Sequence, residues 1–324
     1  MTNLLDTTNG MAVRLKSLSQ GIAPFLFLIL IAAFLSIASE NFLSMQNILT
    51  ILLQISVVGI IAVGQTMVMI TAGIDLSVGG IVGLAGVVTT LLIANFGVPI
   101  GAACLAGVAV GLLCGIVNGG LVVTINMPPF IATLGTMSVT RGLALVLTGG
   151  VAVYELPEAF AWLGNGTLLG IPVPVLILVV VTVLVAVVLR KTSLGRYAYA
   201  IGSNVEAARM SGINVARQLV YVYAICGALS GLAGVILASR IVTGQPTAGL
   251  SYELDAIAAC VIGGTSLFGG VGTALGSVTG AGLMGLIRNG SNLLNVSAFW
   301  QQIVIGVIIW IAVAWDQYRR KRAG

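Results

Sequence analysis

The sequence has no histidine and few charged residues, and each absence excludes a kind of chemistry. Only 7% of the 324 residues are charged, against roughly 25% in a typical soluble domain. A soluble chain of this length could not cover its surface with so few charges. Without histidine, a Ser-His-Asp triad, a His metal site and a His proton switch are all excluded.

Cysteine is scarce as well, and no motif for ATP hydrolysis occurs. The phosphate-binding pattern GxxxxGK followed by Ser or Thr is absent, so we expect this chain not to hydrolyse ATP. Nothing resembles a nucleophile–base pair, and we expect no enzyme activity, no catalytic residue and no bound metal or cofactor. Neither disulfides nor zinc are indicated, because no CxxC pair occurs among Cys104, Cys114, Cys226 and Cys260.

Long apolar stretches make up most of the sequence. Apolar residues account for 58% of the chain, and a membrane-spanning helix needs about 20 of them in succession. The stretches predict an all-α, polytopic membrane bundle of about ten helices in a single domain over 1–324. Within 254–288 two short helices are expected, with a re-entrant pair as the alternative. The other expected spans are 22–39, 48–70, 77–94, 100–123, 130–148, 172–189, 219–239 and 299–315.

The distribution of basic residues predicts the orientation. Eleven of the 14 Lys and Arg residues fall in the N-terminal segment 1–21, the loop 190–217 and the tail 316–324. Basic loops stay in the cytoplasm, so all three segments are expected there. The basic residues form no continuous face, so no nucleic-acid partner is indicated. The exceptions, each toward the outer end of a span, are Arg141, Arg240 and Arg288.

Glycine, with 43 residues, predicts how the helices pack. Gly107, Gly111, Gly115 and Gly119 recur every four residues on one helix face, which allows two backbones to approach closely. Gly272, Gly276 and Gly280 repeat that spacing. The segments 73–80 and 263–270 share the pattern GxxxxxGG. An internal duplication, common in transporters, and chance matching in a glycine-rich chain are both open explanations.

Acidic residues in apolar surroundings are candidate functional sites, because a charge at the centre of a span costs about 2.5–3.5 kcal/mol on insertion scales. Asp75 lies at the expected start of the third span. It is either the N-cap of that helix or a gate and substrate contact. Glu253 and Asp255 begin the eighth span and could complement its helix dipole in the same way.

Five ungapped motifs then resemble a known family. They are AGIDLSVG at 72–79, PFIATLG at 129–135, QPTAG at 245–249, YELDAIAA at 252–259 and GGTSL at 263–267. They resemble the permease subunits of ATP-binding cassette importers for monosaccharides, the ribose, xylose, arabinose and galactose branch, and ribose permeases most closely. The resemblance covers about residues 24–315.

The resemblance implies a function and a set of partners. This chain would form the translocation path for a ribose-like sugar in the bacterial inner membrane. A second permease subunit, expected as a homodimer, would complete the path. A periplasmic binding protein would deliver the sugar, and a cytoplasmic ATPase subunit would bind ATP and Mg. The alternative is an ion-coupled secondary transporter, but proton relays use mid-span acids and every acid here is expected at a span end or in a loop.

The loop 190–217 independently suggests a contact with the ATPase. Asn204 can cap a short helix, Glu206 and Arg209 can pair at i, i+3, and Gly212 suits the helix end. Such a segment resembles the coupling segment of permeases, and a solvated connector is the alternative. The candidate coupling residues are Gly195, Arg196, Asn204, Glu206, Ala207, Arg209 and Gly212.

Polar residues within or beside the spans are candidates for the path and its gate. The spacing does not rank them, and some are expected to form interhelical hydrogen bonds instead. Arg240 and Arg288 either extend to lipid headgroups or dock the binding protein. The candidates for the path or gate are Asp75, Ser77, Gln65, Asn118, Asn126, Thr133, Glu253, Asp255, Thr265 and Ser266.

Overall fold

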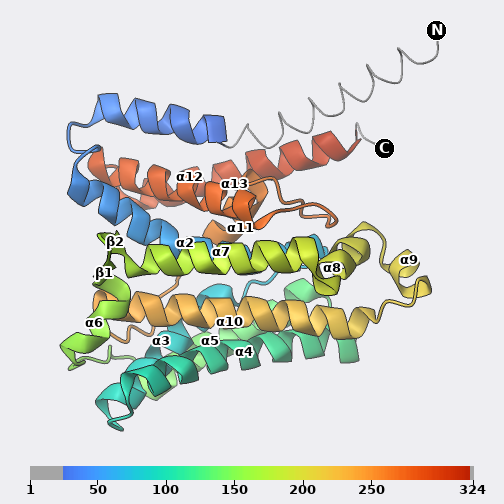
Figure 1. Ribbon diagram of the computed structural model, residues 1–324, viewed down its shortest axis with the longest axis horizontal. Coiled ribbons are helices and arrows are strands. Elements are labelled where there is room, and N and C mark those ends of the chain that lie inside the picture. The colour runs from blue at the N-terminus through green and yellow to red at the C-terminus, as the bar shows by residue number, and fades with distance from the viewer. Residues whose placement is uncertain (1–24, 322–324) are drawn as a thin grey trace.

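Helices make up nearly all of residues 25–321, which are the residues that the computed structural model describes (Figure 1). The expected cytoplasmic segment 1–21 and the last three residues of the tail lie outside this range. The only strands in the described part are β1 (Thr167–Leu168) and β2 (Ile171–Pro172), a short antiparallel pair. The helices are Phe25–Ala38, α2 (Met45–Ile70), α3 (Val78–Ala94), α4 (Ile100–Thr124), α5 (Pro129–Thr148), α6 (Glu158–Asn165), α7 (Val173–Lys191), α8 (Ser193–Ser203), α9 (Val205–Met210), α10 (Val215–Ile241), α11 (Tyr252–Ile262), α12 (Ala274–Leu293) and α13 (Ala298–Lys321).

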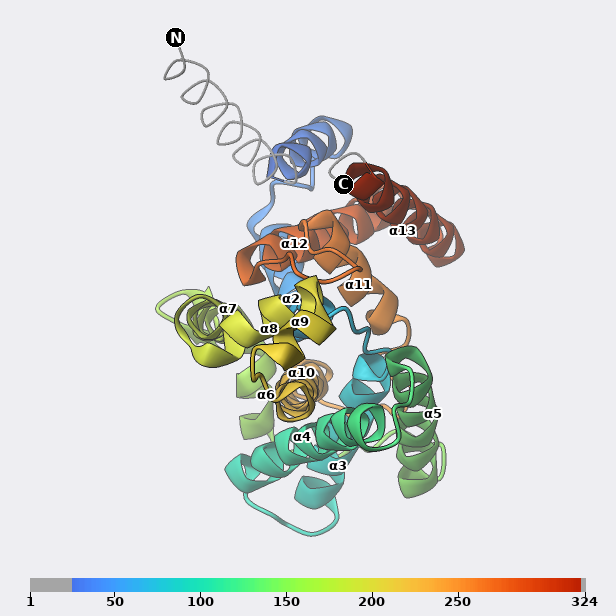
Figure 2. The ribbon, with the colours of Figure 1, turned by 90° about the vertical axis from the view of Figure 1, so that its right-hand side faces the viewer.

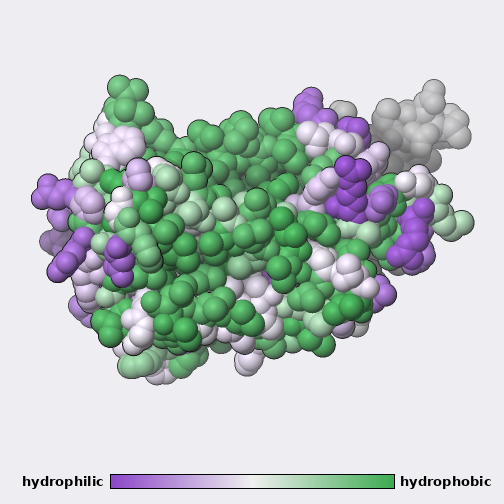
Figure 3. Space-filling model, turned by 90° about the horizontal axis from the view of Figure 1, so that it is seen from below, coloured by the Kyte–Doolittle hydropathy of each residue, from purple (hydrophilic) through white to green (hydrophobic). Residues whose placement is uncertain are grey.

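The predicted all-α membrane bundle is confirmed. Six of the described helices are long and apolar enough to cross a membrane, and two shorter apolar helices accompany them. Hydrophilic residues gather at the two ends of the long axis, with a hydrophobic band between them (Figure 3). The helices α8 and α9 and the end of α13 lie at one end, and α6 lies at the other (Figure 1). The end with α8 and α9 carries the basic loop that is expected in the cytoplasm, and it is called the inner end below.

The interrupted region 254–288 matches neither expected form. The helix α11 has 11 residues, and at 1.5 Å per residue it reaches only about halfway across a bilayer. The helix α12 has 20 residues, which is enough to cross. Between α10 and α11 the chain runs through the non-helical segment 242–251.

The four-helix order that begins with α2 recurs in reverse orientation. A long helix, a non-helical break, a shorter helix and two further helices occur at α2–α5 and again at α10–α13. The helices α2 and α10 run in opposite directions (Figure 1) and lie between α3–α5 on one side and α11–α13 on the other (Figure 2). The breaks that correspond are 71–77 and 242–251. The pattern shared by 73–80 and 263–270 does not coincide with this recurring order, because 263–270 follows α11 instead of preceding it.

Close glycine contacts hold α10 against α4, as the four-residue spacing predicts. Gly111 lies against the Gly227 carbonyl, and Gly115 lies against the Tyr223 carbonyl. A Cβ at Gly119 would stand 2.7 Å from the Val220 Cα. The second ladder packs in the same manner, since Gly280 lies against the Ala259 carbonyl of α11. Small residues thus replace side-chain interlock with backbone contact at both interfaces.

Two glycines of α4 provide a matched test of this packing. We expect Gly115→Ala to lower the thermal unfolding temperature, because the added methyl meets the α10 backbone and overpacking typically costs about 1–3 kcal/mol. Gly120→Ala should leave stability unchanged or slightly raise it, since a Cβ there meets open space and alanine is the better helix former. Thermal unfolding of both variants in detergent measures the difference. Equal stability of the two would show that the α4–α10 contact is loose.

Candidate functional site

The break between α2 and α3 is held by polar side chains from neighbouring helices. After Ile70 the backbone turns, with Ala72 at φ 61°, and α3 begins only at Val78. The side-chain amide of Gln65 can satisfy both backbone groups of Asp75. In that orientation it donates to the Asp75 carbonyl at 3.2 Å and accepts from the Asp75 backbone amide at 3.1 Å. The Thr133 hydroxyl of α5 lies 3.3 Å from the Ile74 carbonyl. These contacts supply partners that water cannot supply within a bilayer.

Asp75 organises the last part of this break. Its Oδ1 accepts from the Ser77 amide at 2.8 Å and from the Ser77 hydroxyl at 2.6 Å. Asn118 of α4 donates to the same hydroxyl at 2.8 Å. The N-cap residue of α3 is Ser77, so the prediction that Asp75 is the cap is wrong. Asp75 instead fixes the turn two residues before the cap.

Asp75 lies in the non-helical segment between two spans, as expected of every acid, but helices enclose it on several sides. Its side chain is fully buried, and its neighbours Asn118 and Tyr223 lie within α4 and α10. Three oxygens of this cluster, Asp75 Oδ2, Asn118 Oδ1 and Tyr223 Oη, have no partner among the described residues. None of the ion pairs found between described residues includes Asp75. One carboxylate oxygen of Asp75 is therefore hydrogen-bonded to Ser77, whereas the other lies beside side-chain oxygens that also lack a partner.

The second break brings α11 to the start of α3. Arg141 of α5 donates to the Gly249 carbonyl at 2.9 Å and lies 3.9 Å from Glu253 Oε2. That carboxylate oxygen in turn lies against Gly79, in the first turn of α3. Glu253 is itself in the first turn of α11, so its charge faces the positive ends of two helices. Gly249, at φ 72°, lies in the segment between α10 and α11 that leads into α11.

Asp255, the other acid of α11, forms an ion pair with Arg288 of α12. The Arg288 Nη2 lies 2.9 Å and 2.7 Å from the two carboxylate oxygens, and the Asp255 side chain is 1% exposed. The Arg288 side chain itself keeps 34% exposure while it pairs with this buried acid. Its expected roles in docking or in reaching lipid headgroups stay predictions.

The remaining path candidates separate into buried, anchored and exposed residues. Thr265 is buried, with its hydroxyl 3.4 Å from the Ser277 hydroxyl. Ser266 donates to Asp316 of α13 at 3.0 Å. Asn126 is exposed, at φ 51°, in the turn between α4 and α5, and it does not join the other candidates.

The predicted coupling residues fall on two helices with different surroundings. Gly195 of α8 packs against the Leu189 backbone. In α9, Glu206 and Arg209 form an exposed ion pair at 3.0 Å, and the Asn204 side chain accepts from the Ala207 amide at 2.9 Å. The predicted short, capped helix is confirmed as a structure. Arg196 is exposed on α8, and Gly212 takes a positive φ of 81° after α9.

Sequence reasoning missed four residues that organise these segments. They act through long-range contacts that no local spacing in the sequence indicates. A charge in an apolar chain was a signal for Arg141 and Asp316, whereas the two tyrosines carry no such signal. The four are Arg141, Tyr199, Tyr223 and Asp316.

Comparison with known proteins identifies the chain. Residues 47–313 match a family described as the permease component of branched-chain amino acid transport systems. The chain belongs to this permease family. It is 46% identical to a ribose import permease of Bacillus subtilis over 98% of both chains. It is 43% identical to that of Haemophilus influenzae, over 91% of this chain and 92% of the relative. No solved structure matches it.

A third relative extends the group beyond ribose. An L-arabinose ABC transporter permease of Azospirillum brasilense is 41% identical over 91% of this chain and 87% of its own length. The chain is therefore the multi-pass permease component of an ATP-binding cassette importer in a bacterial inner membrane, and it is a transport subunit, not an enzyme. Such a component works with an ATPase and a binding protein.

Substitutions of Asp75 separate its hydrogen bonds from its charge. Asp75→Asn keeps an oxygen that accepts from Ser77. It also adds an NH2 donor near Asn118 Oδ1 and Tyr223 Oη, which have no hydrogen-bond partner among the described residues. We expect it to be as stable as the parent. Asp75→Ala should lower the free energy of unfolding by about 1–3 kcal/mol, because the buried Ser77 amide loses its partner.

Thermal unfolding in detergent checks both variants, and transport is measured in parallel. Equal destabilisation by Asp75→Asn and Asp75→Ala would mean that the negative charge itself holds the break. A stable Asp75→Asn protein that does not transport would assign the charge to gating.

Proposed function

We propose that this chain forms the translocation path for ribose or a closely related monosaccharide. The observation that carries the proposal is the 46% identity with a ribose import permease, sustained over 98% of both chains. The family description names branched-chain amino acids instead, but it covers a shorter part of the chain, residues 47–313. The identity with named sugar permeases therefore decides the substrate class.

Uptake into vesicles tests the substrate. The complex of this chain with its ATPase, supplied with its binding protein, should take up labelled ribose when ATP is inside. An excess of unlabelled ribose should compete, whereas leucine should not. Uptake of leucine in place of ribose would overturn the proposal, and stronger uptake of arabinose or xylose would change the sugar but not the class.

We also propose a homodimer in which α5 faces the second copy. Gly135, Ser138 and Gly142 lie on one exposed side of α5, and a Cβ at either glycine would meet open space. Small and polar residues are favoured where membrane helices pack closely or line a path, whereas a surface toward lipid needs only apolar bulk. Thr133 and Arg141, on the same helix, join this face to the two breaks.

The two breaks would serve as the gate. A path must bind its solute weakly, because a deep site would trap it, so we propose no high-affinity sugar pocket. Gln65, Asn118 and Thr133 hold the first break in place, and Arg141 with Glu253 holds the second. In this proposal movement at the breaks opens the path, and specificity resides mainly in the binding protein.

At the outer end, Arg240 and Arg288 remain proposed docking residues for the binding protein. Arg240 is partly buried beside α6, where Asn165 donates to its carbonyl at 2.9 Å. Arg288 pairs with Asp255, and its own side chain is 34% exposed. Exposed charge pairs mostly steer and orient association.

The ATPase contact is proposed for α9 in particular. Met210 is 89% exposed and stands beside the exposed Glu206–Arg209 pair, whereas α8 is packed into the bundle. An exposed methionine next to charges provides an adaptable apolar contact for a partner.

A double change in α9 tests this contact. Met210→Glu combined with Arg209→Glu should reduce copurification of the ATPase and the ATP hydrolysis stimulated by the binding protein, because an apolar anchor and a positive charge are lost together. Membrane insertion should persist, since neither side chain touches the bundle. As a control, Glu155→Lys at the opposite end should leave copurification unchanged. Normal copurification and stimulation in the α9 variant would reduce α9 to a connector.

A further inference from the structure

The last turn of α8 contacts the end of α2, the α2–α3 break and the loop 263–273 through backbone atoms. Gly202 lies against the carbonyl of Ile70, the last residue of α2, and a Cβ there would stand 2.5 Å from the Gly270 nitrogen. The Gly270 amide donates to the same Ile70 carbonyl at 2.9 Å. A Cβ at Gly269 would lie 2.8 Å from the Gly202 oxygen and 2.9 Å from the Ala72 nitrogen. The end of α8, the α2–α3 break and the loop 263–273 thus meet at one point.

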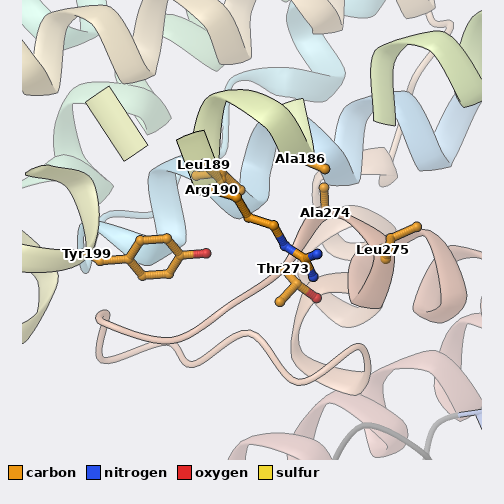
Figure 4. A pocket seen from close by; sticks show the side chains of 7 residues that line it. All are labelled: Ala186, Leu189, Arg190, Tyr199, Thr273, Ala274 and Leu275. Atoms are coloured by element: carbon orange, nitrogen blue, oxygen red, sulfur yellow. The ribbon is translucent and has the colours of Figure 1, made fainter. Parts of the chain in front are cut away.

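A side-chain hydrogen bond reinforces this backbone contact. The Tyr199 hydroxyl of α8 donates to the Gly272 carbonyl, in the loop before α12, at 2.7 Å. Figure 4 shows Tyr199 reaching toward Thr273 and Arg190 beside a small pocket between α7, α8 and α12. Tyr199 lies outside the membrane-spanning helices, and partial burial raises the pKa of its hydroxyl, so it stays protonated as a donor.

The loop 263–273 is in turn attached to the second half of the bundle. Asp316 of α13 accepts from the Ser266 hydroxyl at 3.0 Å and from the Leu267 amide at 3.3 Å. Thr273 caps α12 by accepting from the Gly276 amide at 3.0 Å. A displacement of α8 is therefore transmitted to α2 and α3 through Gly202. It is transmitted to the loop that joins α11 to α12, and to α13, through Gly272.

Stiffness distinguishes this junction from an ordinary helix contact. A long side chain between two elements can change rotamer and absorb a displacement of one against the other. At Gly202, Gly269 and Gly270 there is no side chain to do so, and packed backbones transmit strain. The α9 helix that follows is exposed, so a force applied there acts on α8 directly.

We infer that Tyr199 and Gly202 are positioning residues that transmit the ATP-driven movement of α8 and α9 to the α2–α3 break and to the loop 263–273 between α11 and α12. The inference rests on the proposed contact of α9 with the ATPase. It requires that weakening the junction lowers the transport obtained from each ATP, with the complex still assembled.

A pair of tyrosines on the same helix provides the test. Tyr199→Phe removes the hydroxyl that bonds to Gly272. Tyr197→Phe makes the same chemical change at an exposed side chain for which no hydrogen bond to another described residue is found. Both variants are assembled with the ATPase in vesicles, and labelled ribose taken up per ATP hydrolysed is measured with the binding protein present.

We expect Tyr199→Phe to lower this ratio about two- to tenfold, the range that one lost hydrogen bond produces. Copurification and basal hydrolysis should stay at the parent level, and Tyr197→Phe should keep the parent ratio. Gly202→Ala should lower the ratio as well, whereas Gly120→Ala should not, because only the first methyl meets backbone atoms. An unchanged ratio in Tyr199→Phe would overturn the inference.

The readouts keep the inference separate from the proposals on which it rests. Copurification in the α9 variant reports on the ATPase contact, and the competition series reports on the sugar. Only uptake per ATP in the assembled complex reports on the junction. A fall in that ratio for both tyrosine variants alike would also contradict the inference, because it would assign the effect to α8 as a whole.

Discussion

The structure depends on one constraint, which is that a backbone interrupted inside a bilayer finds no water to satisfy it. Two of the crossings in this bundle are interrupted, at 71–77 and at 242–251. Each break is met by a side chain that bonds directly to backbone groups, Gln65 at the first and Arg141 at the second. The polar residues of the interior are therefore there mainly to make non-helical backbone possible.

The same constraint explains where charges occur. Asp255 is paired with Arg288, and Glu253 faces Arg141 and two helix N-termini. Asp75 is the exception, since none of the ion pairs between described residues includes it and its second oxygen has no hydrogen-bond partner among them. A transport protein has to change conformation, and a buried acid that is bonded on one side only is suited to a segment that moves.

Glycine sets the distance between the moving parts. Along α4 and α10 it brings two backbones into contact over several turns, and at Gly202 it joins α8 to the α2–α3 break and to the loop 263–273. Neither contact has interlocking side chains that could change rotamer and absorb a displacement. The same residue type thus sets close packing within the bundle and at its inner end.

The sequence by itself determined the class of the protein, the helices and their order. Runs of apolar residues locate spans because burial in lipid depends on local composition, and Asn204 with Gly212 delimits a short helix through local bonds. Only the tertiary structure decided what the polar residues do. Nothing near Arg288 in the chain indicates its partner Asp255, which lies 33 residues away. Tyr199 carries no local signal at all, because its partner is a backbone carbonyl 73 residues further on. Partners so distant in sequence are fixed by how helices pack, and packing is a property of the whole bundle.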